Sequence, residues 1–293
     1  MKEINNNISY NNCPACGSQN IVSKGNLYYN EPLVYGTIQI KLLKNPYLVY
    51  CNNCKSYFTG NAIPENDSIE LYTNSNSSER WQAVDFTKDK PLNILKTLNK
   101  YFKHAGNLLD IGCNYGLLLD YAKQLGNNTY GIEYSSKSIE IILNKGHKHI
   151  EKIIDYNEYF DVITAFDLVE HLYDVNKFFN ECHAALKTNG VLVIFTGNPQ
   201  SLGAKLAKNN WWYFNFAEHI NFLSENYYKK YLKLFTVETY QQVYNSNYFK
   251  NMNYNIVSLL QLKKLLFKPS SQKPYNGLPS LLPDHHLIIL RKS

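Results

Sequence analysis

Acidic residues and glycines follow two apolar runs near the middle of the chain. Asp110, Gly112 and Gly116 stand at the end of the first run, and Glu133 closes the second. Glycines at such a point let a strand turn tightly into a helix and let a ligand approach bare backbone, while a carboxylate at a strand end can accept both hydroxyls of a ribose. The pyrophosphate-binding spacing G-x-G-x-x-G is not present, and Asp110 would repel a phosphate. The spacing therefore favours a cationic ligand.

At these residues the sequence resembles the class I S-adenosylmethionine-dependent methyltransferases, whose first motif has the form Asp-x-Gly-x-x-x-Gly and whose second strand ends in an acidic residue. The resemblance implies S-adenosylmethionine as cofactor, with Asp110 and Gly112 at its methionine part and Glu133 at its ribose. Asp167 would then lie beside the sulfonium or the amino group. The remaining cofactor-binding candidates flank these residues: Cys113, Gly116 and Tyr134. Taken singly, the two aspartates could instead cap helices, and Glu133 could lie in a solvated loop.

The segment 167–174 resembles the Glu-His-x-x-Asp signature of small-molecule methyltransferases. Methyl transfer requires a nucleophile held in line behind the methyl group, and a hydroxyl nucleophile must also lose a proton. His171, with an ordinary pKa near about 6.5, is a candidate base at neutral pH. The alternative is that His171 bonds a loop and only orients the cofactor.

A third group of candidates follows the fifth predicted strand, in the segment 197–225. Its order, Trp-Trp-Tyr and then Glu-His-x-x-x-x-Ser, resembles a subgroup of these enzymes that carries an N-terminal zinc ribbon and acts on surface polysaccharides and modified sugars. Aromatic faces suit the C–H surfaces of a sugar, and a carboxylate and an imidazole can bind or deprotonate its hydroxyl. We therefore name substrate candidates Trp211, Trp212, Tyr213 and Glu218, and a second candidate base, His219. Alternatively, the tryptophans belong to the core, and Glu218 and His219 cap a helix.

Four of the six cysteines form two C-x-x-C pairs, Cys13 with Cys16 and Cys51 with Cys54. Two such knuckles supply four thiolates, which satisfy tetrahedral Zn²⁺ and leave no open position for water. The pattern predicts a structural zinc ribbon. Two disulfides are the rival interpretation, although a cytoplasmic chain would not keep them oxidised.

The elements that must position these residues alternate between strand and helix. Predicted strands cover 107–112, 129–134, 148–150, 160–167, 191–195 and 286–292, and predicted helices begin near 91, 117, 136 and 174. This pattern predicts an α/β fold: a Rossmann-like, doubly wound, mostly parallel sheet with an antiparallel last strand. Residues 1–66 would form the zinc ribbon, 67–90 a linker and 91–293 the methyltransferase domain, with 197–225 as its lid. His285 and His286 are expected to be strand residues only.

The whole chain has 293 residues and a formal net charge of +6. No run reaches the roughly 18 apolar residues of a membrane span, and no apolar stretch follows the N-terminal lysine, so we expect a cytoplasmic protein. The lysines are scattered, so the charge alone does not indicate a nucleic-acid partner. The sequence does not address the oligomeric state.

Together these features predict O-methylation of a sugar hydroxyl. One rival is an RNA methyltransferase, but the only basic residues between the two knuckles are Lys24, Lys41 and Lys44, too few for a basic face. A second rival is a non-catalytic module in which the ribbon mediates assembly. C- or N-methylation of a nucleotide sugar is a third.

Overall fold

A computed structural model describes residues 1–29, 32–75, 85–103, 106–245 and 283–293. Seven strands of these residues form one sheet in the order β13-β14-β11-β10-β7-β8-β9. The strands β11 to β9 pair in parallel, whereas β14 is antiparallel to both β11 and β13. In sheet order their bounds are β13 (Phe235–Val243), β14 (His285–Lys292), β11 (Leu186–Gly197), β10 (Phe160–Phe166), β7 (Asn107–Ile111), β8 (Asn128–Ile132) and β9 (Lys148–His149). The predicted fold class is confirmed.

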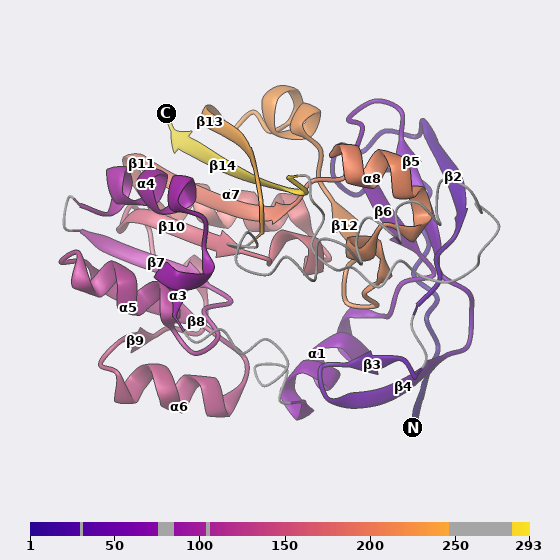
Figure 1. The fold of residues 1–293 in the computed structure, drawn as a ribbon, viewed down its shortest axis with the longest axis horizontal. Coiled ribbons are helices and arrows are strands. Elements are labelled where there is room, and N and C mark those ends of the chain that lie inside the picture. Colours follow the sequence, from indigo (N-terminus) through magenta and orange to yellow (C-terminus); the bar gives the residue numbers. More distant parts are fainter. Residues whose placement is uncertain (30–31, 76–84, 104–105, 246–282) are drawn as a thin grey trace.

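Helices cover both faces of this sheet (Figure 1). One face packs against apolar side chains of α4, α5 and α6, and the other against α7. The bounds are α3 (Phe86–Asp89), α4 (Leu92–Phe102), α5 (Leu117–Gln124), α6 (Ser136–Asn144) and α7 (Val175–Ala185). The predicted strand after α7 begins five residues early, because Leu186 already pairs with Phe160, and Asn189 (φ 64°) and Gly190 form an irregularity within β11.

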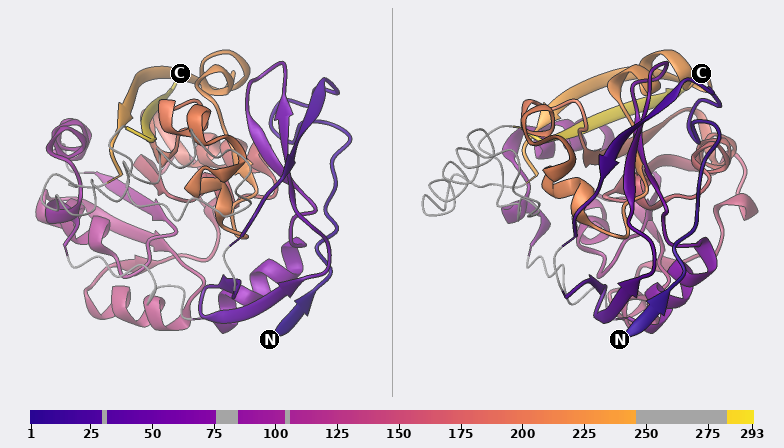
Figure 2. Two further views of the ribbon diagram at one scale, coloured as in Figure 1. Left: turned by 45° about the vertical axis from the view of Figure 1, so that its right-hand side comes forward. Right: turned by 90° about the vertical axis from the view of Figure 1, so that its right-hand side faces the viewer.

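The first 75 residues, here called the N-terminal unit, hold two further sheets and one helix. The larger sheet has the order β12-β6-β5-β2 and the smaller β1-β4-β3. Their bounds are β1 (Lys2–Ile4), β2 (Ile21–Asn26), β3 (Val34–Tyr35), β4 (Ile38–Leu42), β5 (Tyr47–Cys51), β6 (Tyr57–Gly60) and β12 (Asn221–Phe222). Strand β12 comes from the segment 197–225, so the N-terminal unit is completed by a strand distant in sequence (Figure 2).

Helix α1 (Glu65–Asn74) occupies a stretch whose turn-forming residues predict irregular structure. Pro64 precedes it in an extended conformation, and Glu65 and Asp67 stand in its first turn, where carboxylates complement the helix dipole. Leu71 and Ser68 are buried against the N-terminal unit. The start of the expected linker is therefore a helix, while residues 76–84 of that linker lie outside the described residues.

The N-terminal unit and the central sheet share one apolar core. Cys13, Val49 and Phe58 pack in the same buried cluster as Ile163 and Leu192 of the sheet. Removing the N-terminal unit would therefore expose apolar surface on the sheet side as well. In the described part of the chain, no helix combines the length and the apolar character needed to cross a bilayer.

Candidate functional site

Three carboxylates meet at one edge of the sheet. Asp110 is near the end of β7, Glu133 follows β8 and Asp167 follows β10, and these strands are neighbours with parallel direction. In Figure 1 the central strands run toward the side on which the N-terminal unit lies. Ligands of open α/β sheets bind at such an edge. The structure thus brings together the three acidic residues selected from the sequence.

The loop between β7 and α5 has the conformation that its glycines predict. Gly112 and Gly116 have φ angles of 75° and 73°, in the left-handed region that favours glycine. The amides of Gly112 and Cys113 both donate to the Ile132 carbonyl, at 2.9 and 3.2 Å. The Cys113 side chain is buried in the core, so only its backbone faces the loop.

Glu133 ties this loop to the start of α6. Its carboxylate accepts hydrogen bonds from the amides of Asn114 at 2.9 Å, Tyr134 at 2.8 Å and Ser135 at 3.1 Å. The Tyr134 side chain is 69% exposed beside it. Glu133 therefore organises two backbone segments at the strand edge, a role that the sequence did not reveal.

Asp110 lies deeper, where its carboxylate accepts a hydrogen bond of 2.6 Å from the Thr164 hydroxyl. Burial raises the pKa of Asp110 to about 7, and the charge of Glu133 raises it further, although Thr164 opposes this rise. A cation bound beside Asp110 would stabilise its ionised form.

Asp167 adopts a left-handed conformation with φ 47°, and its amide donates to the Phe195 carbonyl at 2.8 Å. Its side chain is 42% exposed. Partial burial would raise the pKa of Asp167, but the His285 imidazole and the Lys90 ammonium outweigh it and hold the pKa at about 2. Asp167 is thus an ionised carboxylate at the mouth of the crevice.

A second carboxyl group, that of Glu170, is fully buried behind Asp167. It accepts a hydrogen bond of 2.9 Å from the Thr196 hydroxyl, and the Tyr213 hydroxyl lies against its other oxygen. The ring of Tyr213 fits here because position 197 is glycine; a Cβ there would come within 2.3 Å of the ring. Burial, and after it the charge of Asp167, raises the pKa of Glu170 to about 8.

The two candidate histidines lie side by side, with ring centroids 4.8 Å apart. His171 Nδ1 is 3.1 Å from the Glu218 carbonyl, and His219 Nδ1 is 2.8 Å from the Tyr213 carbonyl. A carbonyl can only accept, so both Nδ1 atoms carry the proton and both Nε2 atoms hold a lone pair. Burial lowers the pKa of both imidazoles, that of His219 well below its ordinary value.

Exposure distinguishes the two histidines. The His171 side chain is 22% exposed, whereas His219 is buried under the N-terminal unit. Both Nε2 atoms lie near Glu170, since one ligand atom from each of the three side chains falls within 4.8 Å of the others. His171 is therefore the imidazole that a substrate can reach more easily.

The aromatic candidates separate into core and surface. Trp211 is 1% exposed and Tyr213 3% exposed, so neither presents a ring face to a ligand. Trp212 is half-buried, and its indole N–H donates to Asp284 at 2.8 Å. Glu218 accepts from the Gly36 amide at 3.4 Å, so its carboxylate faces the N-terminal unit. Among the three aromatics, Trp212 alone keeps part of its ring accessible.

The N-terminal unit contributes directly to the histidine pair. The Tyr72 hydroxyl of α1 lies 3.0 Å from His171 Nδ1, and the Thr59 hydroxyl of β6 donates to the His219 carbonyl at 3.0 Å. The amide of Ile220 donates to the Glu170 carbonyl at 2.7 Å. The sequence did not indicate Tyr72, because it falls in the stretch assigned to a linker.

The four N-terminal cysteines form one compact group. Cys13 Sγ is 3.7 Å from Cys54 Sγ, and Cys16 Sγ is 3.6 Å from Cys51 Sγ. Four thiolates at about 2.3 Å from one zinc ion would stand about 3.8 Å apart. All six cysteines are free, so the structure does not contain the rival disulfides. The donor set and its spacing fit a tetrahedral zinc ion.

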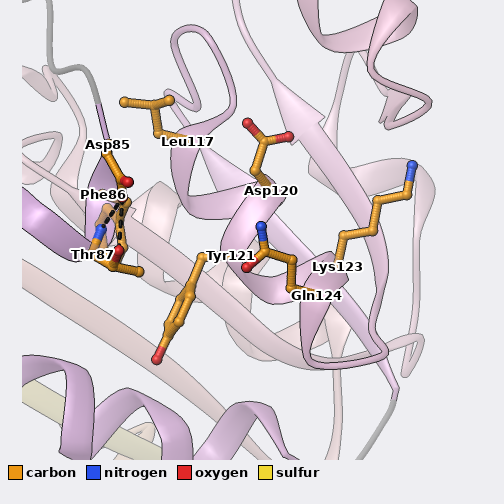
Figure 3. A pocket seen from close by; sticks show the side chains of 8 residues that line it. All are labelled: Asp85, Phe86, Thr87, Leu117, Asp120, Tyr121, Lys123 and Gln124. Carbon is orange, nitrogen blue, oxygen red and sulfur yellow. Dashed lines mark hydrogen bonds between the residues drawn. The ribbon is translucent and has the colours of Figure 1, made fainter.

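One surface hollow, of about 540 Å³, lies between α3 and α5 (Figure 3). It is lined by Asp85, Phe86, Thr87, Leu117, Asp120, Tyr121, Lys123 and Gln124. None of the predicted site residues lines it. We therefore assign it no part in the chemistry.

Comparison with known proteins agrees with this arrangement. Residues 84–241 match the model of a family described as methyltransferase domain. Because the match covers more than half of the chain, the protein belongs to this family. It is a class I S-adenosylmethionine-dependent methyltransferase.

Curated relatives include O-methyltransferases. A ubiquinone biosynthesis O-methyltransferase from Rhodopseudomonas palustris is 37% identical over 165 residues, which cover 47% of this chain and 65% of that protein. One from Pelagibacter ubique is 37% identical over 123 residues, 38% of this chain and 46% of that protein. The matched stretch thus spans less than two thirds of either relative.

Solved structures of similar fold include a methyltransferase from Archaeoglobus fulgidus. It has 20% identity and a TM-score of 0.46, covering 78% of this chain and 100% of that one. One from Mesorhizobium loti has 16% identity and a TM-score of 0.43, covering 64% of this chain and 91% of that one.

Proposed function

We propose that this protein transfers a methyl group from S-adenosylmethionine to a hydroxyl of a small molecule, with His171 as the base. The observation that supports this proposal is the His171–His219 pair at the carboxyl edge of the sheet. Each Nδ1–H is held by a backbone carbonyl, so each Nε2 is an acceptor with a fixed direction. O-methylation also agrees with the names of the two curated relatives.

The cofactor supplies an electrophilic methyl group on a sulfonium. In the proposed reaction the acceptor oxygen forms a bond to the methyl carbon as the carbon–sulfur bond breaks, and the hydroxyl proton passes to His171 Nε2. Asp110 and Asp167 would face the positive charge of the cofactor, and Glu133 its ribose. Cys113 would contribute backbone, Gly112 and Gly116 the close approach, and Tyr134 an exposed ring.

His219 is less exposed and has the more strongly lowered pKa, so we assign it to orientation of the acceptor or of His171. Tyr72 holds His171 from the opposite side. A base whose pKa is lowered stays unprotonated at neutral pH, which suits proton removal.

The acceptor class is a narrower part of the proposal. A sugar hydroxyl, expected from the Trp-Trp-Tyr run, now rests on Trp212 and Glu218, because Trp211 and Tyr213 are buried. The names of the curated relatives favour a different acceptor, and a comparison of both classes distinguishes them. We propose further that Cys13, Cys16, Cys51 and Cys54 hold a structural zinc ion that fixes the N-terminal unit.

The test is methyl transfer from labelled S-adenosylmethionine to two acceptor panels, catechols and other phenols in one and sugar nucleotides in the other. Transfer to either panel, reduced about 10²–10⁴-fold in His171→Ala, supports the proposal. His183→Ala on α7 is the matched control, because His183 is partly exposed and packs on Phe235 instead of at the strand edge. Failure of the wild type to bind the cofactor would refute the assignment of this site.

A further inference from the structure

His285 was expected to be a strand residue without a role, but the structure places it at the site. It is the first residue of β14 and pairs with Gly197 at the carboxyl end of β11. Its ring is fully buried, stacked on Phe195 at 5.0 Å and edge-on to Tyr213 at 5.2 Å. It therefore lies behind Asp167, on the side away from the opening.

Asp284 fixes the orientation of this imidazole. One oxygen of Asp284 lies 2.8 Å from His285 Nδ1, and the other accepts from the Trp212 indole at 2.8 Å. The Asp284 carbonyl accepts from the Asn198 amide at 2.7 Å. Because both carboxylate oxygens act as acceptors, His285 Nδ1 must carry a proton.

The other ring nitrogen, His285 Nε2, faces Asp167 Oδ1 at 3.6 Å. In a neutral ring with its proton on Nδ1, the Nε2 lone pair would point at a carboxylate oxygen, which is repulsive. In an imidazolium the same atom presents an N–H to that oxygen, which is attractive. The geometry thus favours a buried cation between two carboxylates.

The Tyr213 hydroxyl joins Asp167 to Glu170. It lies 3.2 Å from Asp167 Oδ1 and also contacts Glu170 Oε1. A single hydroxyl proton can point to only one of them. If Asp167 is ionised, Tyr213 donates to Asp167 and accepts from a protonated Glu170; if Glu170 is ionised, the order is reversed. The two carboxyls therefore compete for one proton.

We propose that Asp284 and His285 are a positioning pair, in which the His285 imidazolium keeps the negative charge on Asp167 and leaves the proton on Glu170. The pair thereby sets which carboxylate faces the cofactor. This inference rests on the proposed function, because it assigns Asp167 to the cofactor.

The charges around Asp167 agree with this partition. Burial disfavours the charged form of His285, but Asp284 and Asp167 outweigh it and raise its pKa to about 9. Lys90 adds a second cation toward Asp167. The titratable groups that face this cluster from the described elements are Lys90, Asp167, Glu170, His171, Tyr213, His219, Asp284, His285 and His286.

The test compares binding of S-adenosylhomocysteine by wild type and His285→Gln at about pH 8 and about pH 5.5. Glutamine keeps a polar group but removes the cation, so the pKa of Asp167 should rise and the proton should move to it as the pH falls. We expect the ratio of the variant Kd to the wild-type Kd to be about tenfold larger at the lower pH. Using a ratio cancels the titration of Asp110, which both proteins share.

The control is His286→Gln. His286 is equally buried and adjacent on β14, but its Nδ1 contacts the Tyr240 hydroxyl, on the opposite face of the sheet. Its Kd ratio should be the same at both pH values. If His285→Gln does not fold, Asp284→Asn replaces it, and we expect the same direction of change with a smaller amplitude.

A second readout is ¹⁵N NMR of histidine-labelled wild type at about pH 8, where His285 should be protonated at both nitrogens. Its signal is assigned by its loss in His285→Gln. A neutral His285, or a Kd ratio that does not depend on pH, would overturn the inference while leaving the proposed function intact. Absence of binding by the wild type at either pH would instead count against the proposed function.

Discussion

Replacing Glu133 by alanine tests the cofactor crevice most directly. The carboxylate accepts three backbone hydrogen bonds. Tyr134 and its neighbour lie at the surface, so water can replace two of these bonds. The Asn114 bond is partly buried and joins the loop after β7 to the end of β8. Losing such a bond to a charged acceptor costs about 1–3 kcal/mol.

We expect this cost to appear as weaker binding of S-adenosylhomocysteine, by about 5–150-fold in Kd measured by titration calorimetry. Glu133→Gln retains one acceptor oxygen and should show roughly half of the free-energy change. Glu238→Gln is the control, because that carboxylate bonds Tyr101, Lys100 and Arg291 outside the crevice. An alanine variant that is folded and binds within about twofold of wild type would refute the reasoning.

Three further predictions concern the bases, the metal and pH. His219→Ala should lower turnover less than His171→Ala, with cofactor Kd unchanged in both; an equal loss would mean that the two imidazoles act as one unit. Metal analysis should find one zinc ion per chain, and its removal by a chelator should lower turnover before cofactor affinity, because β6 holds the His219 segment; a metal-free protein with full activity would contradict this. The pKa of His285 is raised to about 9 from 6.5, so its contribution to stability, about 3 kcal/mol, is complete below pH ~6.5 and lost as the pH rises toward about 9. Glu170, with a pKa raised from 4.5 to about 8, acts in the same direction, and thermal unfolding across this range should show a flatter slope for His285→Gln.

The sequence predicted the fold well where local patterns decide it. The alternation of apolar runs and glycines located β7, β8 and β10, and hence the three carboxylates that follow them. Pro91 and the apolar positions after it located α4. These features depend on neighbours in the chain, which a single sequence displays.

Features that depend on distant pairing were not predictable in this way. Helix α1 is stabilised by burial of Leu71 in the N-terminal unit, which outweighs the poor helix propensity of its asparagines and serine. The role of His285 requires knowing that β14 lies beside β11. Likewise, no local pattern distinguishes the buried Trp211 from the half-buried Trp212.

The pairing of β12 with β6 has a consequence for synthesis of the chain. The N-terminal strands emerge first from the ribosome, yet the edge of β6 acquires its partner only when residue 222 has been made. Until then the nascent chain presents an unpaired strand edge, a template for association with other chains. Closing a loop of this length is also entropically costly and slow. We expect the N-terminal residues to depend on chaperones or on an early metal ion during translation, and a fragment that lacks the segment 197–225 to aggregate.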